Sequence, residues 1–234
     1  MLSRSVNDLR VYDFDQFDNR LRWSQDQHFT IVAPTGGGKT TVARRLLTRR
    51  KRFVFLATKP HDPSIDSLRK DLGATIVRGW PPRHVTERVI VWPKAKGLLR
   101  DVGTQRITFA HAIDNTYLEG ANCIVLDEAE YVTQALGLDR MLRVLWAQGR
   151  SNKVGVLAMT QRPRFLPRIA WSSANHLLLG RTREREDIAA LGGMGGLDAG
   201  LIRSAVASIP RHWWVYVNTR TEEIAVVRPM EVKT

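Results

Sequence analysis

Residues 29–40 read FTIVAPTGGGKT, and this stretch decides the fold of the chain. It opens with an apolar run, Phe29 to Ala33, whose length and composition predict a buried strand. A glycine-rich turn comes next, and a helix is predicted from about residue 40 to residue 50. A strand, a tight turn and a helix in this order indicate an α/β architecture.

The turn matches the phosphate-binding pattern GxxxxGK[ST], except that Ala33 replaces the first glycine. Glycines allow successive backbone N–H groups to point inward at phosphate oxygens, and the start of the helix adds its positive dipole end. Lys39 would reach the β- and γ-phosphates of ATP, and the Thr40 hydroxyl would bind Mg²⁺. The predicted nucleotide-binding residues are Pro34, Thr35, Gly36, Gly37, Gly38, Lys39, Thr40 and Thr41.

A second apolar run, CIVL at residues 123–126, ends in the acids Asp127 and Glu128. Two carboxylates after a buried strand fit a Walker B element: Asp127 would hold Mg²⁺, and Glu128 would polarise the attacking water. The bland alternative is that both acids begin the next helix, where its dipole favours negative charge. With the phosphate loop upstream we favour hydrolysis of ATP, and we expect an additional strand between the two Walker strands.

The rest of the chain alternates short apolar runs with helical patterns. This alternation predicts a RecA-like P-loop NTPase fold of the additional-strand type, with a mainly parallel sheet, helices on both faces and a C-terminal β-hairpin. Residues 1–24 are expected to be an N-terminal extension, and residues 25–234 a single ATPase domain. Further strands are predicted at 53–56, 75–77, 89–92, 154–158, 176–179, 213–217 and 224–227; further helices at 98–118, 132–146, 183–191 and 201–209; and a flexible connector at 192–200.

The strand at 154–158 runs into Thr160-Gln-Arg-Pro163, and this ending resembles the FtsK–HerA superfamily of ring-forming DNA-pumping ATPases. The resemblance covers roughly residues 25–230. It implies that Gln161 senses the γ-phosphate and that Arg150 acts in the neighbouring subunit's site. Arg143 and Arg140 are rivals for the second role. The chain resembles the minimal viral genome-packaging ATPases within this superfamily.

Composition agrees with an anionic partner. Lys and Arg number 36 against 23 Asp and Glu, a net charge of +13, which favours nucleic acid. The single cysteine, Cys123, fits a reducing compartment. No apolar run approaches the roughly 18 residues of a spanning helix, so we expect no membrane insertion and a cytoplasmic protein, in the host cytoplasm if viral.

The predicted function is therefore an ATP-driven double-stranded DNA translocase, working as a pentameric or hexameric ring that packages viral DNA, with a portal or capsid protein as a further partner. Three alternatives remain open: a helicase-like ATPase, a secretion or phage-assembly ATPase that does not act on DNA, and a switch that binds ATP without turnover. Candidate DNA contacts are basic clusters at 44–45, 49–52, 94–96 and 162–168, and a candidate pore loop lies at 80–84.

Overall fold

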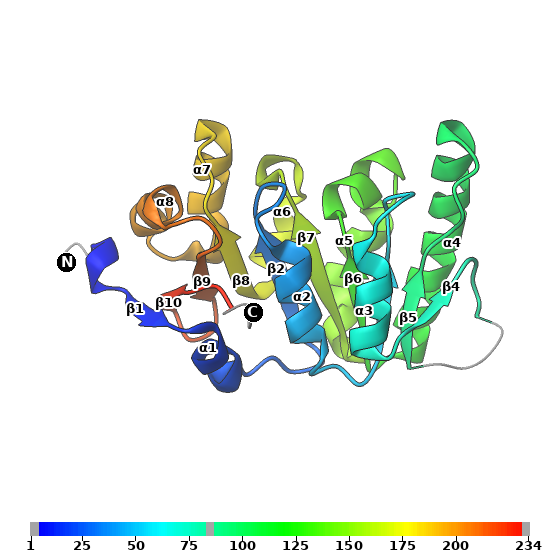
Figure 1. Cartoon of the computed structure of the whole chain (residues 1–234), viewed down its shortest axis with the longest axis horizontal. Helices are drawn as coiled ribbons and strands as arrows, with labels where there is room; N and C mark the ends of the chain where they lie inside the picture. The colour runs from blue at the N-terminus through cyan, green and yellow to red at the C-terminus, as the bar shows by residue number, and fades with distance from the viewer. Residues whose placement is uncertain (1–4, 83–86, 231–234) are drawn as a thin grey trace.

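The computed structural model describes residues 5–82 and 87–230. These residues form one ten-stranded sheet in the order β1-β10-β9-β8-β2-β7-β6-β3-β5-β4 (Figure 1). The strands are β1 (Arg10–Tyr12), β2 (His28–Val32), β3 (Phe53–Leu56), β4 (Thr75–Val77), β5 (Arg88–Val91), β6 (Asn122–Leu126), β7 (Val154–Thr160), β8 (Ala174–Gly180), β9 (Trp214–Asn218) and β10 (Glu223–Val227).

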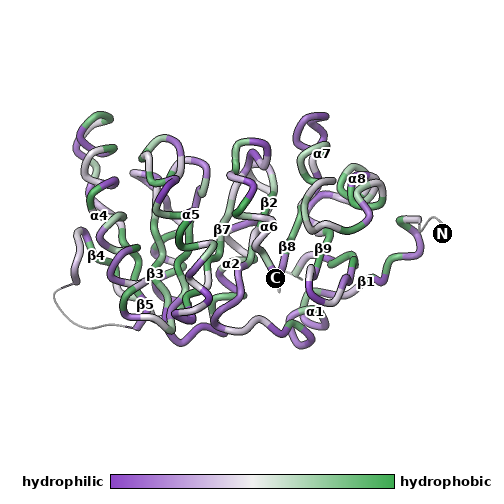
Figure 2. Tube along the Cα trace, turned by 180° about the vertical axis from the view of Figure 1, so that it is seen from behind, coloured by the Kyte–Doolittle hydropathy of each residue, from purple (hydrophilic) through white to green (hydrophobic). Residues whose placement is uncertain are grey.

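Alternate residues of a strand point to opposite faces of the sheet. The central strands are buried on both faces, and helices cover each face. One core contains Phe29, Phe53 and Phe55 together with side chains of α1, α2 and α3, and the opposite cores contain Val54, Ile124 and side chains of the remaining helices. Figure 2 shows the strands as mainly hydrophobic. The helices are α1 (Phe14–Arg20), α2 (Lys39–Leu47), α3 (Ser64–Leu72), α4 (Leu98–Glu119), α5 (Asp139–Gln148), α6 (Arg168–Ser172), α7 (Arg185–Gly192) and α8 (Ala199–Ser208).

The strand order confirms the predicted fold class. β7 pairs in parallel with both β2 and β6, so it is the additional strand between the strand of the phosphate loop and the strand of the acid pair. β9 runs antiparallel to both β8 and β10, which confirms the C-terminal hairpin. The other strand pairs are parallel, and parallel strands end at one common edge.

Two local predictions are wrong. The single helix expected at 132–146 is divided into a π-helical turn, Tyr131–Ala135, and α5, because Gly137 adopts a left-handed φ of 64° that a continuous helix excludes. The connector expected to be flexible at 192–200 contains a 3₁₀ turn, Met194–Gly196, and its Met194 side chain is fully buried against the α7–α8 core.

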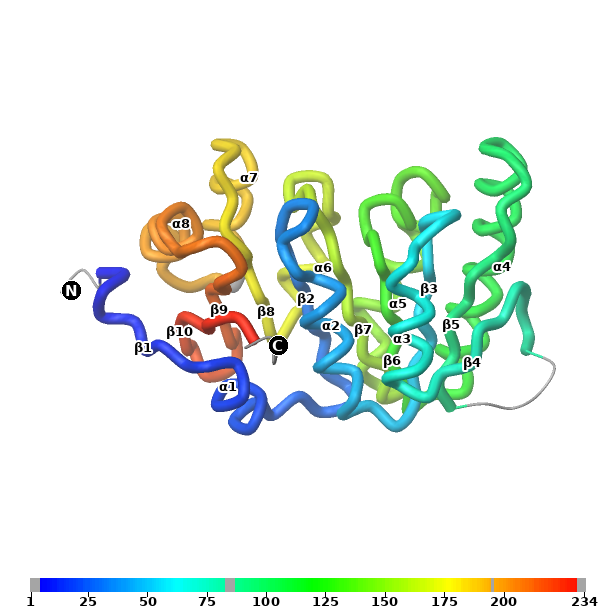
Figure 3. The backbone as a smooth tube through the Cα atoms, in the orientation of Figure 1, coloured from blue at the N-terminus to red at the C-terminus, as the bar shows by residue number. Residues whose placement is uncertain are grey.

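The N-terminal segment is built into the sheet. β1 pairs in parallel with β10, and Phe14 and Phe17 of α1 are 2% exposed within the same core as α2. Figure 3 shows this segment (blue) crossing beside the last described residues (red), which run from β10 toward α2. Residues far apart in sequence therefore support one another at this end of the sheet.

Candidate active site

The phosphate loop joins the end of β2 to the start of α2. Gly36 and Gly38 adopt left-handed φ values of 70° and 92°, a conformation that favours glycine. Gly37 has no room for a side chain, since a Cβ there would lie 2.8 Å from the Cβ of Ala33. The sequence thus permits a tight turn whose backbone approaches a ligand closely at the N-terminus of α2.

Lys39 folds back over this loop. Its Nζ donates hydrogen bonds to the carbonyl oxygens of Ala33 at 2.7 Å and Pro34 at 3.3 Å. Burial lowers the pKa of Lys39 to about 8, while the nearby Glu128 carboxylate opposes this shift. A partly desolvated ammonium whose hydrogen-bond partners are neutral carbonyls is suited to pairing with phosphate oxygens.

Asp127 follows β6 and is 5% exposed. The Thr58 hydroxyl lies 3.4 Å from its Oδ2, and the Lys59 ammonium lies 3.9 Å from the same oxygen. Burial raises the pKa of Asp127, while Lys59 opposes this shift. The carboxylate therefore lies in a dry position where one further cation would be favourable.

The donor set near Asp127 suits Mg²⁺. Mg²⁺ prefers oxygen ligands, and it is usually held by one or two protein groups together with substrate phosphates and water. Thr40 and Asp127 supply a hydroxyl and a carboxylate to the same cavity. Within residues 5–82 and 87–230 there is no group of three or more His, Cys, Asp or Glu that could hold a metal ion by itself.

Gln161 connects the phosphate loop with the acid pair. It lies directly after β7, and its Oε1 accepts a hydrogen bond from the Thr35 hydroxyl. Its backbone N–H donates to Oε1 of Glu128 at 3.3 Å. Gln161 therefore contacts both Thr35 and Glu128, and a ligand that displaced its contact with Thr35 would also affect Glu128.

These side chains surround one cavity of about 840 Å³. The structure thus brings together the phosphate loop, the acid pair and Gln161, three elements that are more than 30 residues apart in sequence. Pro34 lines an adjacent cavity of about 450 Å³ instead. The predicted site residues that line the larger cavity are Thr35, Gly36, Gly37, Gly38, Lys39, Thr40, Thr41, Asp127, Glu128 and Gln161.

Arg150 lies elsewhere. It belongs to the 3₁₀ turn Gly149–Asn152, which precedes β7, whereas the cavity lies where β7 ends. Its Nε is 3.2 Å from Oδ2 of Asp26, and its side chain is 59% exposed. A residue that acts on a neighbouring subunit need not approach the site of its own chain, so the proposed role stays a prediction. The rival Arg143 pairs with Asp139 at 2.6 Å, and Arg140 is exposed.

Several cavity residues carry no motif in the sequence. Lys59 lies three residues after the predicted strand at 53–56, and this position was its only signal. The others belong to the loop before β9, to the start of β9 and to the segment after β10, and no spacing or composition in the sequence connects them with the phosphate loop. These residues are Arg211, His212, Trp214, Pro229 and Met230.

The basic clusters are largely paired within the chain. Arg45 and Arg49 bind Asp18 at 3.0 and 2.6 Å, and Arg50 is 3% exposed and packs over the Trp23 ring. Arg162 forms ion pairs with Glu184 and Asp187 of the α7 region. By contrast, Lys94 and Lys96 are exposed. In the candidate pore loop, Arg83 and His84 lie outside the described residues.

The fold and the cavity together define a P-loop ATPase. The sequence profile described as AAA domain matches residues 21–168, so the chain belongs to that family. A comparison with curated proteins gave no match. No helix within the described part of the chain has the length and apolarity needed to cross a bilayer.

Solved structures share the fold at low sequence identity. The genome packaging NTPase B204 of Sulfolobus turreted icosahedral virus 2, in complex with AMPPCP, is 16% identical, with a TM-score of 0.63 over 88% of this chain and 100% of that chain. VirB4 of Thermoanaerobacter pseudethanolicus is 11% identical, with a TM-score of 0.67 over 88% and 90%. The Type VII secretion ATPase EccC of Thermomonospora curvata is 18% identical, with a TM-score of 0.56 over 89% and 26%. These similarities confirm the P-loop NTPase fold expected from the sequence.

Proposed function

We propose that this chain hydrolyses ATP and uses the energy to move double-stranded DNA through a homo-oligomeric ring. One observation carries the proposal: the lysine-bearing loop, the acid pair and Gln161 line the same cavity at one edge of the sheet. This arrangement supplies a cradle for phosphates, oxygen donors for a cation and a carboxylate for water, which are the parts that hydrolysis of a triphosphate requires.

Each residue has a distinct role in this proposal. Lys39 exchanges its loop carbonyl partners for phosphate oxygens. Thr40 and Asp127 would hold Mg²⁺, which when bound would neutralise charge on the phosphates. Glu128 accepts a proton from the attacking water as it adds to the γ-phosphorus, and the bond to the ADP oxygen breaks, which leaves ADP and phosphate.

Water can reach Glu128 without passing the phosphate loop. Glu128 and Gln161 also line a second cavity of about 600 Å³, which lies on the side of Glu130 and Tyr131. A carboxylate between a triphosphate cavity and a second opening is in position to act on water that enters from that side. Gln161 is exposed to both cavities, so it is suited to report whether a γ-phosphate is present.

Two observations support DNA as the substrate of movement. The net charge of +13 favours a polyanion, and the fold is shared with the genome packaging NTPase B204. A motor that must act on any sequence contacts phosphates rather than bases, and such contacts release counterions. We therefore expect DNA to stimulate ATP hydrolysis, and we expect this stimulation to fall steeply as salt rises.

The test is steady-state ATPase activity of the full chain with and without linear duplex DNA, from about 50 to 200 mM salt. Wild type should show DNA-stimulated turnover, and Lys39→Ala should show none. Mass measured with a non-hydrolysable ATP analogue should reveal a ring of five or six subunits. Turnover of Lys39→Ala at the wild-type rate would exclude the assignment of the phosphate loop.

One alternative has specific support. VirB4 and EccC share the fold, and EccC is described as a Type VII secretion ATPase. An ATPase coupled to protein transfer should hydrolyse ATP at the same rate with or without DNA across the whole salt range. Unwinding of a duplex by the isolated chain would instead favour the helicase-like alternative.

A further inference from the structure

The C-terminal hairpin returns to the edge of the sheet where ATP is proposed to bind. Trp214, the first residue of β9, lies opposite Gly180, the last residue of β8. It also lies opposite Val227, the last residue of β10. Because β9 is antiparallel, the loop before it and the segment after β10 both emerge at the edge where the parallel strands end.

This hairpin closely approaches the phosphate loop. A Cβ on Gly38 would lie 3.7 Å from Cζ2 of Trp214 and 3.9 Å from Nδ1 of His212. A Cβ on Gly36 would lie 3.6 Å from Nη2 of Arg211. The loop before β9 therefore lies beside the N-terminus of α2. The guanidinium of Arg211 in this loop lies next to the glycines of the phosphate loop.

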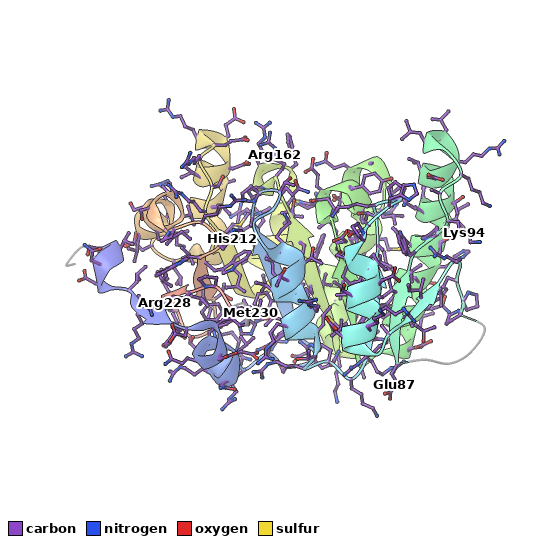
Figure 4. All side chains as sticks on the ribbon, in the orientation of Figure 1. Glu87, Lys94, Arg162, His212, Arg228 and Met230 are labelled. Atoms are coloured by element: carbon purple, nitrogen blue, oxygen red, sulfur yellow. The ribbon has the colours of Figure 1, made fainter. Side chains whose placement is uncertain are left out.

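The cavity has two chemically different ends. Asp127, Glu128 and Gln161 follow β6 and β7, on one side of β2 in the sheet, and this is the side where the γ-phosphate would react. Pro229 and Met230 follow β10, on the other side of β2, and they supply apolar surface there. A nucleoside triphosphate has the same asymmetry, because a flat base lies at the opposite end from the γ-phosphate. Flat bases bind well against apolar and aromatic side chains. Figure 4 shows His212 and Met230 beside α2.

We propose that the hairpin forms the nucleoside half of the site: Met230 and His212 contact the base, and Arg211 contacts phosphates bound to its own subunit. This inference rests on the proposed ATPase function and specifies which residues hold the substrate.

The N-terminal segment contacts Arg228, two residues before Met230. The backbone N–H of Arg228 donates to the carbonyl oxygen of Tyr12 at 2.8 Å, and its Nη1 lies 3.2 Å from Oδ1 of Asp13. The Arg228 guanidinium also lies 5.6 Å from the centre of the Trp213 ring. Arg228 thus ties the segment that carries Met230 to the N-terminal segment and to the loop before β9.

The experiment compares two ligands on the full chain, ATP and inorganic triphosphate, by calorimetric titration with Mg²⁺. Triphosphate has the phosphates of ATP without its nucleoside. Met230→Ala should weaken ATP binding by about tenfold, since truncation removes apolar contact, and should leave triphosphate binding unchanged. His212→Asn should act in the same direction, and asparagine tolerates the left-handed φ of 67° at this position. Arg211→Ala should weaken binding of both ligands.

Two variants serve as matched controls. Met141→Ala truncates a partly buried methionine in the opposite core, and Arg220→Ala removes one exposed charge at the far end of the same hairpin. Both should bind ATP as wild type does. Wild-type ATP affinity in Met230→Ala and His212→Asn would overturn the inference, and the proposed function would survive if Lys39→Ala still abolished ATP binding. Absence of ATP binding by the wild-type chain would overturn both.

Discussion

Raising the pH should weaken ATP binding through Lys39. Burial lowers the pKa of Lys39 to about 8 in the free protein, from an ordinary value of 10.5. Phosphates bind the ammonium and not the neutral amine, so at higher pH binding must restore a proton that the free protein has lost. At pH 9 about one molecule in ten carries this proton, and the dissociation constant of ATP should rise about tenfold for each pH unit above 8.

Calorimetric titration from pH 7 to pH 9.5 at constant ionic strength measures this effect. Titrations in two buffers of different ionisation enthalpy should reveal uptake of nearly one proton per ATP at pH 9. Lys39→Arg keeps its charge throughout this range, so whatever affinity it retains should not depend on pH. A wild-type affinity that stays constant up to pH 9.5, with no proton uptake, would refute the pairing of Lys39 with phosphate.

The same lowered pKa of Lys39 should make the free protein more stable as the pH rises, whereas it makes ATP binding weaker. Because the folded pKa of Lys39 is below its unfolded value, the unfolded chain binds more protons between pH 8 and pH 10.5, and stability should rise with pH. The rise is at most about 1 kcal/mol between pH 8 and pH 9. Burial raises the pKa of Cys123, and this shift lowers stability as the pH rises. Urea unfolding of wild type should therefore be compared with that of Lys39→Met, because this variant removes only the lysine contribution.

Three further predictions concern the chemistry, the N-terminal segment and the ring. Glu128→Gln should bind ATP normally but hydrolyse it at least about a hundredfold more slowly in a single-turnover assay, and a normal rate would mean that another group activates water. Phe17→Ala should lower the free energy of unfolding by about 3–5 kcal/mol, measured with urea, whereas Phe165→Ala at a 37% exposed site should cost far less. Arg150→Ala, mixed into wild-type rings at low ratios, should reduce ATPase activity more than dilution does; a loss in simple proportion would exclude a trans-acting role.

The strands were predictable because the sheet is covered on both faces. A strand buried on both sides is a continuous apolar run, and such runs appear in the sequence at β3 with the observed boundaries and at β6 within one residue of them. Helix α3 was not predicted and has only nine residues, although its apolar positions Ile65, Leu68 and Leu72 are spaced as on one face of a helix. β1 was not predictable, since its three residues show no buried face and its pairing with β10 joins opposite ends of the chain.

The two halves of the candidate site differ in how far the sequence could indicate them. The family resemblance of the ending at 160–163 indicated Gln161, and this residue reaches the site because it directly follows a parallel strand, whose carboxyl end lies at the common edge. Met230 reaches the same edge only because β9 reverses direction and β10 reverses again, and its position further depends on Arg228 contacting Tyr12 and Asp13. Local motifs therefore mark the phosphate half, because a phosphate cradle requires glycines and a lysine at fixed spacing. The proposed nucleoside half is apolar surface that many different side chains could provide, so only the order of the strands in the structure indicates it.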